Sequence, residues 1–115
     1  MKNKYNAKKV DYHGITFDSR AEARRFQQLK DQLAAGAIRN LELQPRYVIL
    51  PSYKRGGRTV RKTEYVADFR YQTPDGKTIV EDVKSPITAK NPVYRLKKKM
   101  FEYKYPDVIF REVMS

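Results

Sequence analysis

The sequence predicts an α/β (α+β) protein in which a mixed central sheet is flanked by two helices and preceded by a short N-terminal β-hairpin. Two segments carry helix start signals, and the stretches between and after them have the composition of strands separated by glycine or proline turns. At 115 residues, 40% of them hydrophobic, the chain can bury one modest core. We therefore expect one domain over residues 10–115, preceded by a flexible basic arm over residues 1–9.

The segment that follows the arm predicts the hairpin. It turns at His13 and Gly14, and its apolar residues are Tyr12, Ile15 and Phe17. These apolar side chains are suited equally to a dimer surface and to the core.

Residues 19–37 predict the first helix. Ser19 is a good N-cap residue, Glu22 completes a capping box, and Gly36 provides a left-handed stop. One helical step of four residues back from the apolar stripe leads to Glu22, so we expect Glu22 at the core-facing edge. The stripe consists of Phe26, Leu29 and Leu33.

From Ile38 the pattern changes to strands, and we expect an antiparallel meander over residues 38–53, 59–72 and 78–85. The last turn, TPDGK, favours a three-residue loop that ends in a left-handed glycine. With this loop Asp68 lies opposite Asp82, and alternation places Lys84 on the same face. A two-residue turn would instead place Asp68 opposite Glu81.

A second helix and a final strand complete the expected fold. Asn91 and Pro92 are suitable cap and first-turn residues for a helix over residues 92–104. We expect the strand over residues 107–113 to run parallel to the strand over residues 78–85, because a helical crossover joins them. The side chains expected to be buried by the helix are Val93, Leu96, Met100 and Tyr103.

The paired acids Asp68 and Asp82 predict a site that binds a divalent cation. Like charges that face each other on a sheet cost about 0.2–1 kcal/mol, so a sequence without a use for them would usually avoid the pairing. A divalent cation converts the repulsion into coordination, and Mg²⁺ also binds phosphate. With Lys84 beside them, the acids have the components for metal-assisted hydrolysis of a phosphodiester.

Composition favours a polyanionic partner. The chain has 25 Lys and Arg against 13 Asp and Glu, a formal net charge of +12. It has no cysteine and one histidine, which argues against thiolate, cysteine-zinc and histidine-triad chemistry. No apolar run approaches a membrane span or a signal peptide, so we expect a cytoplasmic protein without membrane contact. The basic residues expected to contact DNA are Arg20, Arg24, Arg55, Arg58, Lys90, Arg95, Lys97, Lys98 and Lys99.

Asp68 in VADF, Asp82 and Lys84 in EDVK, and Glu22 in SRAEARRF resemble the motif of the PD-(D/E)xK nucleases, the restriction-endonuclease-like superfamily. The expected element order, helix, three strands, helix, strand, is similar to the core of that fold. Within the superfamily the chain looks like small phage-encoded endonucleases and, more distantly, Holliday junction resolvases. It departs from the common motif at Ala67, where many members have proline, and at Asp82, where glutamate is commoner.

The resemblance implies a Mg²⁺-dependent (or Mn²⁺-dependent) DNA endonuclease, with Glu22, Asp68 and Asp82 as metal-site residues and Lys84 as a catalytic residue. It also implies branched or recombination DNA as the substrate. The similarity to junction resolvases, which typically act as dimers, implies a homodimer. If the protein is phage-encoded, the resemblance implies the host cytoplasm as its location.

Several alternatives remain open at this stage. Glu22 is equally suited to helix capping alone, Asp82 and Lys84 to an exposed ion network, and Glu81 to a solvated charge or a partner for a basic residue. A non-catalytic nucleic-acid-binding module would account for the net charge without the acids. A structural protein that binds an acidic protein partner is the third possibility.

Overall fold

A four-stranded mixed sheet forms the centre of the fold, in the computed structural model that describes residues 9–12 and 14–115. Its order is β10 (Ile109–Met114), β9 (Thr78–Lys84), β8 (Phe69–Gln72) and β3 (Arg39–Leu43). Strand β9 runs antiparallel to β8 and parallel to β10, as we expected for two strands joined by a helical crossover. The expected α/β class with a mixed sheet is confirmed.

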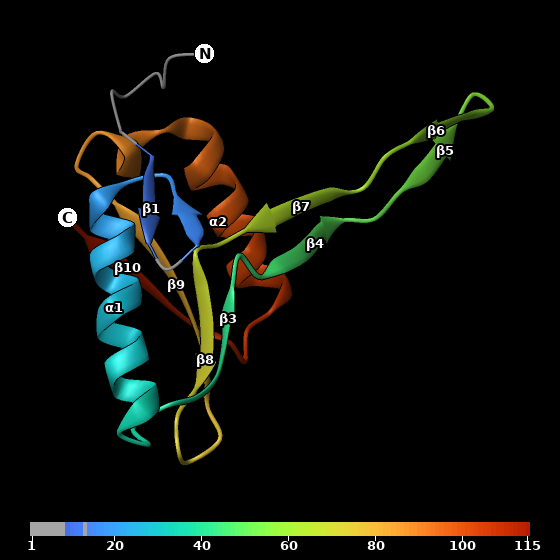
Figure 1. The fold of residues 1–115 in the computed structure, drawn as a ribbon. Coiled ribbons are helices and arrows are strands. Elements are labelled where there is room, and N and C mark those ends of the chain that lie inside the picture. The colour runs from blue at the N-terminus through green and yellow to red at the C-terminus, as the bar shows by residue number, and fades with distance from the viewer. Residues whose placement is uncertain (1–8, 13) are drawn as a thin grey trace.

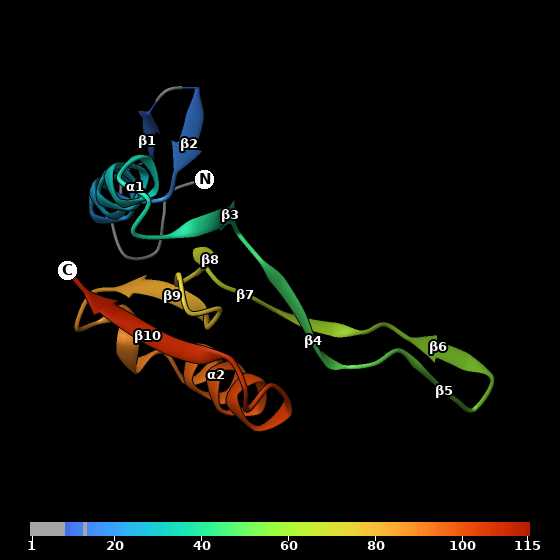
Figure 2. The ribbon, with the colours of Figure 1, turned by 90° about the horizontal axis from the view of Figure 1, so that it is seen from below.

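Helices cover both faces of this sheet (Figures 1 and 2). On one face lie α1 (Arg20–Ala34) and the hairpin of β1 (Val10–Tyr12) and β2 (Ile15–Phe17). On the other lies α2 (Pro92–Lys104), which follows the short helix η1 (Thr88–Lys90). The first core includes Phe17, Phe26, Leu29, Phe69 and Tyr71, and the second includes Ile49, Tyr65, Val80, Tyr94 and Phe101.

The leading hairpin of β1 and β2 packs against the first core. Of the two roles expected for its apolar side chains, core and dimer surface, the structure shows the core role. Phe17 is a member of that core, while Tyr12 and Ile15 pack against it half-buried. The turn at His13 and the arm up to residue 8 lie outside the described residues, and only the last arm residue, Lys9, is seen, exposed.

Helix α1 begins and ends as its sequence predicts. The Ser19 hydroxyl accepts the Glu22 N–H at 3.1 Å, and Gly36 follows the helix with φ +76°. Glu22 returns a hydrogen bond one residue beyond the standard capping box, because its Oε2 accepts the Asp18 N–H at 3.1 Å. Leu33, which we expected in the core stripe, is 39% exposed since it lies in the last turn beyond the sheet contacts.

The buried face of α2 differs from the expected one. Val93 and Leu96 are 62% and 55% exposed and Tyr103 is 89% exposed, whereas only Met100 of the expected set is half-buried. Tyr94 and Phe101, two turns apart, face the sheet instead. The helix carries apolar residues on both sides, and the aromatic pair removes more apolar area from water, which decides its orientation.

The turn between β8 and β9 has the expected register. The Thr73 N–H donates to the Lys77 carbonyl at 2.9 Å, and Gly76 has φ +87°. Pairs such as Phe69 with Glu81 continue this register, which places Asp68 opposite Asp82.

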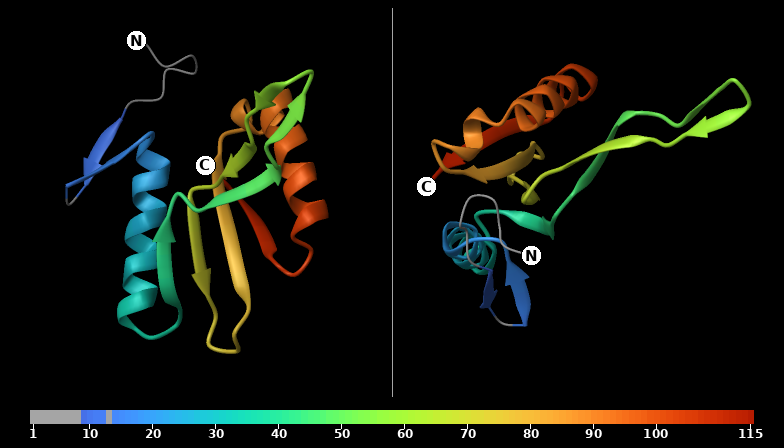
Figure 3. Two further views of the ribbon diagram at one scale, coloured as in Figure 1. Left: turned by 90° about the vertical axis from the view of Figure 1, so that its right-hand side faces the viewer. Right: turned by 90° about the horizontal axis from the view of Figure 1, so that it is seen from above.

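The two long strands expected over residues 38–53 and 59–72 are each broken into three. Gln44, with φ +50°, and Pro45 interrupt the first between β3 and β4 (Arg46–Leu50), and Pro51 interrupts it again before β5 (Tyr53–Arg55). The return consists of β6 (Arg58–Val60), β7 (Thr63–Val66) and β8. All three pairings are antiparallel, and β4–β7 and β5–β6 leave the body as a long projection (Figure 3).

No helix within residues 9–12 and 14–115 is long and apolar enough to cross a membrane.

Candidate active site

The two aspartates lie on neighbouring strands at the centre of the sheet. Asp68 directly precedes β8, where its N–H donates to the Glu81 carbonyl at 3.0 Å and its Oδ2 accepts the Val83 N–H at 2.7 Å. Asp82, on β9, is only 3% exposed. The backbone of β9 thus fixes the position of both carboxylates.

Glu22 reaches the same place from the first turn of α1. It is 5% exposed, and together with Asp68 it lines two small cavities of about 270 Å³ and 140 Å³. Ser19 caps the helix at this point, so the capping interaction also fixes the turn from which the Glu22 side chain extends. Helix capping and a place at the site are therefore compatible roles for Glu22.

Lys84 completes the cluster on the face of β9 that carries Asp82. Its Nζ lies 3.8 Å from Asp82 Oδ1 and 4.2 Å from the centre of the Tyr94 ring. A third cavity of about 410 Å³ is lined by Asp82, Lys84 and Tyr94, with Lys97 at its border. The lysine is thus held between a carboxylate and an aromatic face, beside an opening to solvent.

Two tyrosines that the sequence did not single out belong to this site. The Tyr65 hydroxyl donates to Asp82 Oδ2, and the Tyr94 hydroxyl donates to Glu112 Oε2 at 2.6 Å. Strand alternation does not connect Tyr65 with the acids, because β7 ends at Val66, before Asp68. Tyr94 lies on α2, outside the apolar stripe that the sequence predicts for that helix. A tyrosine-rich sequence gives no means of distinguishing these two residues from core tyrosines.

Burial and mutual repulsion raise the pKa of both aspartates. Burial, followed by the adjacent Glu22 carboxyl, raises the pKa of Asp68 from its usual 3.8 to about 7. Burial, followed by the charge of Asp68, raises the pKa of Asp82 from 3.8 to about 8, and Lys84 opposes this only in part. Without a cation, the pair therefore retains protons near neutral pH.

These shifts predict that the metal-free protein loses stability as the pH rises from about 4 to about 8. Native pKa values above the unfolded value of 3.8 mean that the native state binds more protons than the unfolded state across this window. The melting temperature in chelator should therefore fall more steeply with pH for the wild type than for Asp82→Asn. A constant gap between the two melting curves from pH 5 to pH 8.5 would contradict the expectation.

The donor chemistry of the site suits a hard divalent cation. Mg²⁺ commonly takes one or two carboxylates and keeps several waters, which matches Asp68 and Asp82 beside solvent-accessible cavities. Among the residues that the structure describes, no group of three or more acidic, histidine or cysteine side chains is arranged to hold a metal ion. The fit is therefore to a two-carboxylate site, and a ligand role for Glu22 stays a prediction.

Comparison with known proteins places the chain in a family. Residues 2–114 match the family model described as Protein of unknown function (DUF1064). The chain belongs to this family. Among solved structures, the chain is similar to one titled "Crystal structure of SSO0001", with 13% identity, a TM-score of 0.43 and coverage of 82% of this chain. The chain spans 45% of that protein, and no curated protein matches.

In this DUF1064 chain Glu81, which directly precedes Asp82 and points to the opposite face of β9, has a structural role. Glu81 is fully buried, with its Oε1 2.7 Å from Arg25 Nε and its Oε2 2.6 Å from Arg25 Nη2, and it also accepts the Tyr71 hydroxyl. Of the two alternatives for Glu81, the partner for a basic residue is confirmed and the solvated charge is wrong.

The local hydrogen bonding explains why alanine occupies position 67, where the PD-(D/E)xK motif often has proline. The Ala67 N–H donates to the Pro45 carbonyl at 3.1 Å, at the place where β4 and β7 give way to β3 and β8. Proline at this position would lack the donor. Alanine therefore retains a backbone hydrogen bond directly beside Asp68.

The basic residues expected to contact DNA are distributed over four places. Lys90, Arg95, Lys98 and Lys99 line one open cavity of about 900 Å³ between η1, α2 and β10, whereas Lys97 borders the Asp82 cavity. Two of them are engaged, since Lys98 Nζ lies 3.8 Å from Glu112 Oε2 and Lys97 Nζ donates to the Glu64 carbonyl at 3.2 Å. Arg20 and Arg24 are exposed on α1, and Arg55 and Arg58 are exposed at the end of the projection.

Proposed function

We propose that this protein is a metal-dependent DNA endonuclease that hydrolyses phosphodiester bonds. The observation that carries the proposal is the pair Asp68 and Asp82 on adjacent strands with Lys84 Nζ 3.8 Å from Asp82. Buried like charges are costly unless a cation is bound between them. A lysine near such a pair suits the negative charge that develops on a phosphate during hydrolysis.

Four residues have distinct expected roles in this reaction: Asp68, Asp82, Tyr65 and Lys84. Asp68 and Asp82 would hold a Mg²⁺ or Mn²⁺ ion, and the bound ion would polarise the scissile phosphate and lower the pKa of a water. Tyr65 holds Asp82 Oδ2, so the Oδ1 atom, which faces Lys84, is left for other partners. The Tyr94 ring limits the movement of Lys84, which is then available to orient the attacking water and to stabilise charge.

The partner is expected to be DNA because the net charge is +12 and two lysines, Lys84 and Lys97, line the same cavity as Asp82. Branched or recombination DNA, a homodimer, a phage origin and a cytoplasmic location are further parts of the proposal. They rest on the resemblance of the Glu22, Asp68, Asp82 and Lys84 motifs to those of junction resolvases and phage endonucleases.

A cleavage assay tests the function directly. Wild-type protein should cut labelled DNA with Mg²⁺ or Mn²⁺ and leave it intact with chelator, and Asp82→Asn purified in parallel should remove the activity. Four-way junction, flap, linear duplex and single-stranded DNA, resolved on a denaturing gel, identify the preferred structure. Intact DNA in every reaction over a range of salt concentrations would reject the proposal.

A non-catalytic nucleic-acid-binding module is the second candidate. It is favoured by the exposed basic side chains at the end of the projection, Arg55 and Arg58, because phosphate binding there needs no acidic residue. Its expected result is a mobility shift that is the same with Mg²⁺ and with chelator, is unchanged by Asp82→Asn, and is accompanied by no cleavage.

A further inference from the structure

The end of the projection contributes almost nothing to the core. Strands β5 and β6 and the turn between them, here called the ribbon (residues 53–60), form the end of the projection (Figure 1). Every side chain of the ribbon is exposed except that of Val60, which is half-buried. Two-stranded hairpins are only marginally stable alone in water. Fold stability therefore does not account for the ribbon, and a partner surface would.

The charge of the ribbon identifies the kind of partner. The ribbon and the two residues on either side of it (residues 51–62) contain five basic side chains and no acidic one. They are Lys54, Arg55, Arg58, Arg61 and Lys62. Arg55 and Arg58 are direct cross-strand partners, and like charges in such positions repel. A polyanion that binds between or beside them removes this repulsion.

The pairing of the ribbon gives it two different faces. Tyr53 pairs with Val60 and Arg55 with Arg58, and alternation places these four side chains on one face. Lys54 and its partner Thr59 lie on the other face. One face thus combines two guanidinium groups with an aromatic and an aliphatic side chain.

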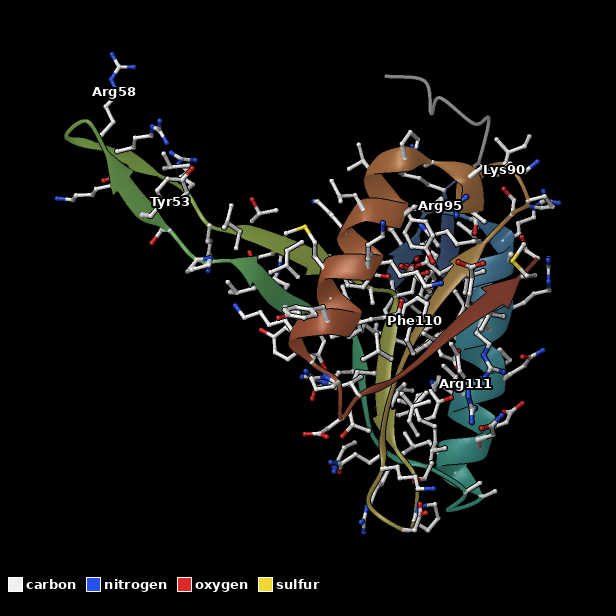
Figure 4. All side chains as sticks on the ribbon, turned by 180° about the vertical axis from the view of Figure 1, so that it is seen from behind. Tyr53, Arg58, Lys90, Arg95, Phe110 and Arg111 are labelled. Atoms are coloured by element: carbon white, nitrogen blue, oxygen red, sulfur yellow. The ribbon has the colours of Figure 1, made fainter. Side chains whose placement is uncertain are left out.

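The turn makes the tip narrow. Gly56 and Gly57 have φ +56° and +77°, which is the two-residue hairpin geometry that favours glycine. Neither carries a side chain, and a Cβ added to either would meet no atom within 4 Å. Arg58 extends away from the body at this end (Figure 4).

We propose that the ribbon enters the major groove of duplex DNA beside the cleavage site, with Arg55 and Arg58 directed to base edges. The inference deepens the proposed function and rests on it for the choice of DNA. A major groove about 12 Å wide admits a two-stranded ribbon, whereas a minor groove of about 6 Å does not. Arginine binds guanine O6 and N7 with two hydrogen bonds, and Val60 is suited to a thymine methyl group.

The length of chain between the ribbon and Asp68 limits how far from the proposed cleavage site the ribbon can contact DNA. β7 leads from the ribbon to Asp68, and ten residue steps separate Arg58 from Asp68. At about 3.3 Å per residue this is at most about 33 Å, close to one helical turn of B-DNA. The ribbon should therefore contact DNA no more than about ten base pairs to one side of the cut.

Binding without cleavage tests the proposal. Wild type, Arg55→Gln/Arg58→Gln and the charge-matched control Arg39→Gln/Lys77→Gln are titrated in chelator against a 30-base-pair duplex. Arg39 and Lys77 are exposed and lie at the opposite end of the sheet from the site. We expect the ribbon variant to bind at least about tenfold more weakly and the control less than about threefold more weakly.

Methylation interference locates the contact. Methylation of guanine N7 on one side of the bound centre should block the wild type and leave the ribbon variant unaffected. Equal affinity losses in both double variants, absence of N7 interference, or a larger effect on duplex RNA than on DNA would overturn the proposal. So would a ribbon variant that changes only the sedimentation mass, because the ribbon would then bind a second copy. Failure of the wild type to cut with Mg²⁺ rejects the nuclease function alone, since these measurements need no cleavage.

Discussion

Asp82→Asn is expected to lower the rate of DNA cleavage by about a thousandfold or more while leaving the protein folded. Removing one carboxylate from a two-carboxylate site withdraws the charge that would hold the metal, and metal stabilisation of the transition state is worth several kcal/mol. Each 1.36 kcal/mol corresponds to about a factor of ten in rate. Single-turnover cleavage of the preferred DNA with saturating Mg²⁺ measures the loss.

The same substitution should raise stability in chelator. Asp82 is buried opposite Asp68, and replacing it with an amide of the same shape removes the repulsion while retaining an acceptor for the Tyr65 hydroxyl. We expect a higher melting temperature than wild type at pH 8 and loss of the increase that Mg²⁺ gives the wild type. Glu102→Gln, an exposed change of equal charge on α2, is the control.

Two results would contradict this account of the pair. If Asp82→Asn cleaved within tenfold of the wild-type rate, Asp82 would not be at the centre of the chemistry. If it melted lower than wild type in chelator, the carboxylate would be contributing to stability through Tyr65 and Lys84, as a structural ion network would.

The sequence was sufficient for the site wherever local rules apply. The loop over residues 74–76 determines the β8–β9 register, and that register alone places Asp68 opposite Asp82 with Lys84 on the same face. The helical step from Phe26 to Glu22 placed Glu22 at the buried edge correctly. Each of these inferences depends on a turn type or on a helical period that spans only a few residues.

Other features depend on contacts between distant segments, and these the sequence did not reveal. Tyr65 and Tyr94 reach the site because the projection bends at Gln44 and Pro45 and because α2 rotates its aromatic side chains toward the sheet. The predicted buried face of α2 was wrong because Val93 and Leu96 have the same helical spacing as a buried stripe. Tyr94 and Phe101 face the sheet because this aromatic pair removes more apolar area from water than Val93 and Leu96 would.

Arg25→Met is expected to lower the free energy of unfolding by about 3 kcal/mol, the largest stability effect we predict. Glu81 is 0% exposed, and removal of Arg25 would leave a fully buried carboxylate with Tyr71 as its remaining donor. Breaking one side of a buried ion pair commonly costs about 3–5 kcal/mol. The lower value applies because the Arg25 side chain is itself 18% exposed, so water can reach the vacated space. Urea denaturation measures the loss.

Arg24→Met, a neighbouring exposed arginine on α1, should change stability by less than about 0.5 kcal/mol and is the matched control. The double variant Arg25→Met/Glu81→Leu should recover most of the loss, because an apolar pair leaves no unpaired charge in the core. An Arg25→Met variant as stable as Arg24→Met would contradict the assignment of Glu81 as a buried, paired charge. The expected loss also bears on activity: the Arg25–Glu81 contact joins α1 to β9, the strand of Asp82 and Lys84, and α1 carries Glu22. One face of β9 thus anchors the helix that brings Glu22 to Asp68, while its other face carries Asp82 and Lys84.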